Sequence, residues 1–173
     1  MANSPRRIYW DSCVWIASIQ KEKIRDGKGN ITEDRDGMCR NVIEAAKKGQ
    51  IELVTSFFTQ AEVFKPGDAA TANLEAYFES DYILRVNVDK FVSDRAQAIM
   101  GSGLSKGLRP PDATHLATAA VSSVEEMHTF DDHLLKLDGK IDKADGTKLK
   151  ICKPDPGGPP APLLDAMKAK SGE

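Results

Sequence analysis

Residues 110–121 read Pro-Pro-Asp-Ala-Thr-His-Leu-Ala-Thr-Ala-Ala-Val, and they give the clearest structural signal in the chain. Two prolines suit the first turn of a helix, where the backbone N–H is not needed, so we expect a helix from Asp112 to Val121. Asp112 then lies in the first turn, where a negative charge complements the helix dipole. A glycine-rich link, Gly101 to Gly107, separates this helix from the segment before it.

Short apolar runs typical of buried strands alternate with helical patterns on both sides of this helix. We expect strands at Arg6–Trp10, Ile51–Val54, Ile83–Val88, Met127–Phe130 and Lys148–Cys152. We expect helices at Cys13–Ile19, Met38–Ala46, Ala69–Phe78, Val92–Met100 and Asp131–Leu137, and another, capped by Thr55 or Ser56, that runs to Phe64. This alternation predicts an α/β fold of three layers, α/β/α, with a central, mainly parallel sheet of about five strands.

Two segments fall outside the alternation. Residues 21–37 are charged and contain three glycines, which indicates a loop or a mobile insertion. Five of the nine prolines lie between Pro154 and Pro162, so we expect one domain over residues 1–153 and a proline-rich arm over residues 154–173. The arm is either a disordered tail or a segment whose apolar end docks on its own domain or on a second protomer.

Composition excludes several classes of protein. The chain has 173 residues, with 24 Lys and Arg against 26 Asp and Glu, so it is not a uniformly basic nucleic-acid binder. No apolar run approaches the ~20 residues that span a bilayer, and the N-terminus lacks the pattern of a signal peptide. Three scattered cysteines form neither a disulfide framework nor a zinc motif, which favours a cytoplasmic location.

Four acidic residues stand at comparable places in the predicted elements. Asp11 ends the first predicted strand, and Glu62 lies on the helix after the second. Asp112 lies in the first turn of its helix, and Asp131 follows the fourth strand. Ligands of open α/β sheets bind at the carboxyl ends of parallel strands, where clustered carboxylates need a cation such as Mg²⁺ or Mn²⁺. Each residue also has a purely structural explanation as a helix cap or a dipole partner, and spacing alone does not decide between the two.

Four segments resemble the signature blocks of PIN-domain nucleases, in order and in spacing. They are residues 8–12 (IYWDS), 55–63 (TSFFTQAEV), 111–119 (PDATHLATA) and 129–134 (TFDDHL), and the resemblance extends from Arg6 to Cys152. The third block is the most specific. In style the chain is most similar to the VapC-type toxins of toxin–antitoxin pairs.

The resemblance implies a Mg²⁺- or Mn²⁺-dependent endoribonuclease that acts on RNA, pairs with an antitoxin protein and forms a homodimer. It implies that Asp11, Glu62, Asp112 and Asp131 bind metal and catalyse, with Ser12 and Thr129 as supporting hydroxyls. Where many relatives have a further acid two places after the last one, this chain has His133, and Asp132 is the alternative fourth acid.

Three further residues each allow a structural and a functional interpretation. Lys106 and Arg109 are either surface cations or contacts to the RNA backbone. His115 lies one helical turn after Asp112, and we expect a packed or solvent-facing histidine there rather than a site residue. The rival function is a PIN-like module that binds RNA or protein without cutting.

Overall fold

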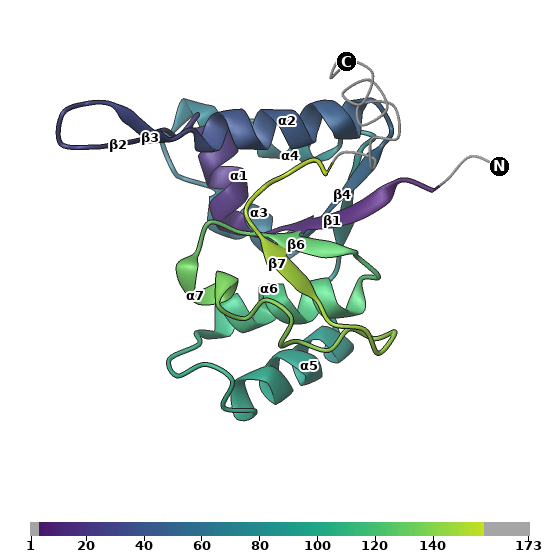
Figure 1. Ribbon diagram of the computed structural model, residues 1–173. Coiled ribbons are helices and arrows are strands. Elements are labelled where there is room, and N and C mark those ends of the chain that lie inside the picture. Colours follow the sequence, from purple (N-terminus) through teal and green to yellow (C-terminus); the bar gives the residue numbers. More distant parts are fainter. Residues whose placement is uncertain (1–3, 158–173) are drawn as a thin grey trace, which may run out of the picture.

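The computed structural model describes residues 4–157, and its core is a five-stranded parallel sheet (Figure 1). The strand order is β5-β4-β1-β6-β7. The strands are β1 (Arg6–Trp10), β4 (Ile51–Ser56), β5 (Ile83–Val86), β6 (Glu126–His128) and β7 (Lys150–Cys152). The predicted α/β fold with its central parallel sheet is therefore confirmed.

Strand β1 forms the middle of the sheet. Residues 6–9 pair with residues 51–54 of β4, and residues 8–10 pair with residues 126–128 of β6. Successive side chains of a strand point to opposite faces, so Ile8 and Trp10 enter one core while Tyr9 enters the other. All three are fully buried, as expected for a strand covered on both faces.

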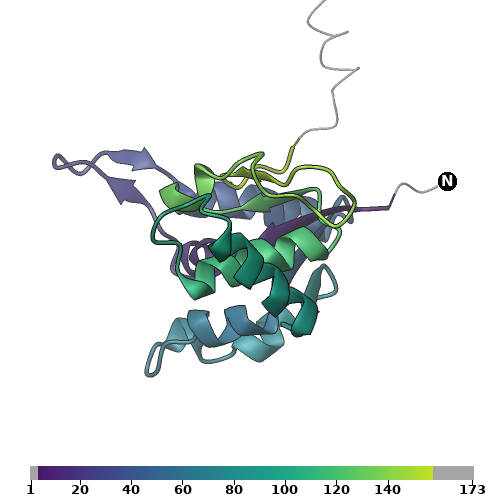
Figure 2. The ribbon, with the colours of Figure 1, turned by 90° about the horizontal axis from the view of Figure 1, so that it is seen from below.

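Helices cover both faces of the sheet (Figures 1 and 2). One core contains side chains from α1 (Ser12–Ile19), α2 (Arg35–Lys47), α3 (Phe57–Val63) and α4 (Leu74–Phe78). The other contains side chains from α5 (Lys90–Gly101), α6 (Pro110–Val121) and α7 (Asp132–Leu135). This arrangement gives the three layers that the sequence predicts.

Polar caps turn the chain from strand to helix at the carboxyl edge of the sheet. Asp11 follows β1, and its side chain accepts a hydrogen bond from the backbone N–H of Val14 in α1. Ser56 ends β4 and accepts from Thr59 in α3, while Asp131 accepts from His133 in α7. These side chains meet helix N–H groups that have no partner within the helix, so the same edge collects polar and acidic residues.

The prediction of a loop over residues 21–37 is wrong in part. This segment forms an antiparallel hairpin of β2 (Ile24–Arg25) and β3 (Ile31–Glu33), which projects from the body of the molecule (Figures 1 and 2), and α2 begins at Arg35. The Asp26 carboxylate holds the turn by accepting bonds from the backbone N–H groups of Lys28 and Asn30, and Gly29 takes a φ of 85°.

The remaining differences concern element ends. The helix predicted over residues 69–78 is split into a short 3₁₀ turn, Ala69–Thr71, and α4. The predicted arm lies outside the described residues from position 158 onward, and the domain boundary at 153 stays a prediction. Within residues 4–157, no helix combines the length and the apolar character needed to cross a bilayer.

Candidate metal centre

A small cleft of about 140 Å³ opens at the carboxyl edge of the sheet. All four predicted acids line it, although they come from four separate places: the residue after β1, α3, α6 and the turn after β6. The full lining is Asp11, Ser12, Cys13, Glu62, Arg109, Pro111, Asp112, His115, Asp131 and Leu134. The fold thus brings together four acids that lie up to 120 positions apart in the sequence. The role of these acids as metal ligands stays a prediction.

Asp11 is the most buried of the four acids, at 3% exposure. Burial raises the pKa of its carboxyl group above the ordinary value, and hydrogen bonds from Cys13, Thr129 and Val14 oppose this shift. The Cys13 thiol donates to Asp11 Oδ1 at 2.9 Å. A buried carboxylate with mostly neutral donors around it gains from a nearby cation.

Glu62 reaches the cleft from the last turn of α3 and meets His115 of α6. Glu62 Oε2 lies 2.6 Å from His115 Nε2, and the Tyr9 hydroxyl lies 2.8 Å from His115 Nδ1. His115 is packed, as expected, but it also lines the cleft, which the sequence analysis ranks as the less favoured of its two interpretations. Its place one turn after Asp112 on the same helix is the signal that could have indicated this role.

Asp112 lies in the first turn of α6, and its side chain meets that of Arg109, the residue that precedes the helix. The Arg109 guanidinium donates two hydrogen bonds to this carboxylate, Nε to Oδ2 at 3.0 Å and Nη2 to Oδ1 at 3.3 Å. Arg109 also lines the cleft, so one cation of the chain itself stands beside the acids. Lys106, the other residue predicted to contact the RNA backbone, is exposed and is not among the described residues that line the cleft.

The turn after β6 is ordered by Thr129. This buried side chain accepts a hydrogen bond from the backbone N–H of Asp131 at 3.0 Å and lies 3.4 Å from the Cys13 sulfur. Asp131 lines the cleft, whereas Asp132 is exposed and, like Lys106, is not among the described lining residues. The geometry therefore favours Asp131 over Asp132 as the fourth acid.

The donor set of the cleft suits a hard divalent cation. Carboxylate oxygens are the ligands that Mg²⁺ and Mn²⁺ prefer, and Mg²⁺ commonly takes one or two carboxylates together with water. Within the part of the chain that the structure describes, the four acids do not place three ligand atoms within 4.8 Å of one another. This spacing fits an ion that keeps part of its water shell.

One group in residues 4–157 does place three ligand atoms that close, namely Glu126, His128 and Cys152. None of these three residues lines the acidic cleft. The negative charge of Glu126 is already neutralised, because its carboxylate contacts Lys150 at 2.7 Å and Arg6 at 3.3 Å. The Trp10 indole donates to His128 Nδ1 at 3.0 Å, and burial raises the pKa of the Cys152 thiol to about 11. We read this group as a buried ion-pair network.

This network predicts a dependence of stability on pH. Burial alone would raise the pKa of Glu126, but hydrogen bonds from His128 and Lys150 lower it to about 2, and burial lowers the pKa of His128. Both folded-state pKa values lie below the unfolded ones, so we expect stability to fall as pH drops through 6.5 and again from 4.5 towards 2. Urea unfolding between pH 3 and pH 7 measures this.

Glu126→Gln tests the contribution of the carboxylate. We expect the variant to lose on the order of 3 kcal/mol at pH 7 and to show a flatter profile below pH 4.5. Glu125→Gln is the matched control, because Glu125 is an exposed partner of the same Arg6. Equal pH profiles for Glu126→Gln and the parent protein would contradict the assignment.

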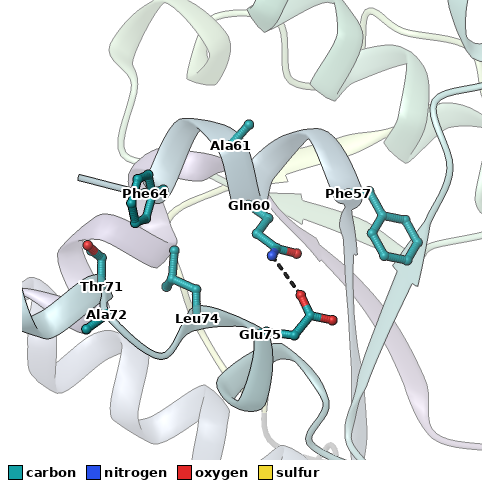
Figure 3. A pocket seen from close by; sticks show the side chains of 8 residues that line it. All are labelled: Phe57, Gln60, Ala61, Phe64, Thr71, Ala72, Leu74 and Glu75. Atoms are coloured by element: carbon teal, nitrogen blue, oxygen red, sulfur yellow. Dashed lines mark hydrogen bonds between the residues drawn. The ribbon is translucent and has the colours of Figure 1, made fainter. Parts of the chain in front are cut away.

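A larger and separate groove of about 520 Å³ lies between α3 and α4 (Figure 3). Phe57 and Phe64 border it and are about half exposed, and Gln60 donates to Glu75 across it at 2.7 Å. Helix α3 therefore serves two sites, with Glu62 in the acidic cleft and Gln60 in this groove.

Fold and cleft together define a three-layer α/β protein with an acidic cleft at the carboxyl edge of its sheet. The sequence profile of the PIN domain matches residues 8–140, and the chain belongs to the PIN domain family. Among solved structures, it is similar to VapC20 of Mycobacterium tuberculosis, a toxin that cleaves the sarcin–ricin loop, with 17% identity and a TM-score of 0.53. The match covers 72% of this chain and 90% of VapC20. No curated protein sequence matches the chain.

Proposed function

We propose that the protein is a divalent-metal-dependent endoribonuclease and the toxin of a toxin–antitoxin pair. The observation that carries the proposal is the meeting of Asp11, Glu62, Asp112 and Asp131 in one cleft of a PIN-family chain. The fold similarity to VapC20, a toxin that cleaves RNA, supports the proposal for the toxin role.

The four acids would hold Mg²⁺ or Mn²⁺. When bound, such an ion generates hydroxide from water and stabilises the charge that builds on the phosphoryl group. Asp11 and Asp131 contribute carboxylates whose positions are set by the caps of α1 and α7, so their geometry is fixed before the substrate arrives. Ser12 lines the same cleft, and Thr129 holds the backbone of the turn that carries Asp131.

Cleavage of a mixed RNA pool tests the enzymatic part. We expect products with Mg²⁺ or Mn²⁺ and none in excess EDTA, and we expect a circular RNA to be cut, because an endonuclease needs no chain end. Full activity in EDTA would overturn the metal dependence. If RNA is bound but never cut under any metal condition, the protein is the non-catalytic PIN-like module.

Expression in growing cells tests the toxin part. We expect the protein alone to arrest growth and co-expression of a cognate antitoxin to relieve the arrest. An enzyme that is active when purified but does not affect growth would contradict the toxin role. We also propose a homodimer, which sedimentation tests directly.

Arg109 is proposed as an RNA-backbone contact, together with the more distant Lys106. The Arg109 guanidinium pairs with Asp112, so a bound cation and Arg109 would compete for one carboxylate. A cation in the cleft would release Arg109 for a phosphate group of the substrate.

Arg109→Gln separates these two effects. We expect Mn²⁺ binding to tighten by roughly two- to fivefold, the range for losing an exposed ion pair. We expect RNA binding to weaken. We also expect the logarithm of the binding constant to fall less steeply with the logarithm of salt concentration, by about one in the slope. Lys48→Gln is the matched control, because Lys48 precedes β4 at the opposite edge of the sheet. Equal effects of both variants would contradict a specific contact.

A further inference from the structure

Three side chains form a hydrogen-bonded chain from the core to the acidic cleft. It runs from the Tyr9 hydroxyl to His115 Nδ1 at 2.8 Å and from His115 Nε2 to Glu62 Oε2 at 2.6 Å. Tyr9 is fully buried in β1, and His115 of α6 is 2% exposed. The Glu62 side chain, 23% exposed, faces the cleft.

The chemistry of the partners fixes the direction of these bonds. A carboxylate only accepts hydrogen bonds, so His115 Nε2 carries a proton and donates it to Glu62. In the neutral imidazole, Nδ1 then accepts a bond from the Tyr9 hydroxyl. Burial raises the pKa of Tyr9, so the phenol keeps the proton that it donates.

Packing fixes the orientation of the imidazole. The rings of Tyr9 and Phe58 each lie 5.9 Å from the His115 ring, and they come from β1 and α3. Glu62, by contrast, is the last residue but one of a seven-residue helix, and among the described residues its side chain bonds to His115 alone. Its second oxygen, Oε1, has no hydrogen-bond partner among the residues that the structure describes.

We propose that His115 is a positioning residue for Glu62. Held by Tyr9, the imidazole fixes one oxygen of the Glu62 carboxylate and leaves the other to bind a divalent cation in the cleft. The inference rests on the proposed metal site and adds to it a residue outside the four acids. Simple filling of the core accounts for the burial of His115, but it does not account for a bond to a cleft carboxylate on another helix. Hydrogen bonds of this kind orient ligating carboxylates in metal proteins.

Two variants of His115 separate positioning from packing. The Asn side chain reaches the place of Nδ1 and leaves Glu62 without its donor, whereas the Gln side chain reaches the place of Nε2 and can keep that bond. We expect His115→Asn to weaken Mn²⁺ binding by about 10- to 100-fold, and His115→Gln to retain an affinity within roughly threefold of the parent protein. Calorimetric titration with Mn²⁺ alone measures both, and urea unfolding of the metal-free variants reports the packing cost separately.

The outcomes are distinct. If both variants bind Mn²⁺ as the parent does, or if both lose affinity equally, His115 does not position Glu62. If His115→Asn does not fold, Tyr9→Phe decides, because this variant keeps the imidazole but removes the hydroxyl that holds it. We then expect Mn²⁺ binding to weaken by about threefold or more. Unchanged Mn²⁺ binding by Tyr9→Phe overturns the inference. If the parent protein itself does not bind Mn²⁺, the proposed metal site fails instead.

Discussion

Asp11→Asn is expected to slow RNA cleavage strongly while the fold stays intact. The amide oxygen of Asn can still accept the bond from Val14 that caps α1, but the negative charge beside the cation is lost. We expect a decrease of roughly 10²- to 10³-fold, which corresponds to about 3–4 kcal/mol of transition-state stabilisation. Initial rates at saturating Mg²⁺ measure the loss, and circular dichroism reports the fold.

The same variant has a second readout in the metal-free protein. Burial raises the pKa of Asp11, so ionisation of this side chain opposes folding at neutral pH. Removing the charge is expected to raise the Tm of the metal-free protein, which a thermal unfolding scan measures.

Asp81→Asn is the matched control for both measurements, because this exposed residue precedes β5 at the opposite edge of the sheet. It is expected to change neither rate nor Tm. Cleavage by Asp11→Asn at the parental rate would contradict the assignment of the cleft.

The largest effect on stability is expected from Trp15→Ala. Trp15 of α1 is fully buried, and its ring meets those of Trp10 and Phe78 at centroid distances of 4.7 and 5.1 Å. Its indole N–H donates to Thr55 Oγ1 at 3.1 Å. The cavity left by the truncation is expected to cost about 3–5 kcal/mol, a large share of the 5–15 kcal/mol that holds a typical domain folded.

Urea denaturation at pH 7 measures this cost. Trp15→Phe keeps an aromatic ring but loses the indole donor, so we expect a smaller loss of about 1–2 kcal/mol. Phe91→Ala is the surface control: Phe91 is 76% exposed on α5, and the change is expected to stay within about 0.5 kcal/mol. A loss below about 1 kcal/mol for Trp15→Ala would contradict the central place of this ring.

The sequence predicted the sheet well because its signals are local. Apolar runs such as Ile8 to Trp10, bounded by an acid at Asp11, indicate buried strands without knowledge of their neighbours. The hairpin over residues 24–33 was missed because its two strands are very short, and its glycines and charges are also typical of loops. Its stability comes from cross-strand bonds and from the Asp26 turn.

The candidate site shows a similar division. Spacing could mark Asp11, Glu62, Asp112 and Asp131 one by one, but their meeting in one cleft depends on strand order, which the family resemblance supplied. For His115 the sequence favours a packed histidine, because its hydrogen-bond partners lie too far away in sequence to be inferred, 106 positions at Tyr9 and 53 positions at Glu62. The local sign of a role in the cleft is its place one turn after Asp112 on the same helix.

The order of the strands also governs when the protein can fold during its synthesis. Of the five strands of this sheet, β1 leaves the ribosome first. It needs β4 on one side and β6 on the other, and β6 ends only at His128. Contacts between such distant parts of a chain form slowly. A nascent chain that has reached α5 therefore has an open edge on β1 and lacks both Asp112 and Asp131. The acidic cleft can therefore assemble only after Asp131 has left the ribosome.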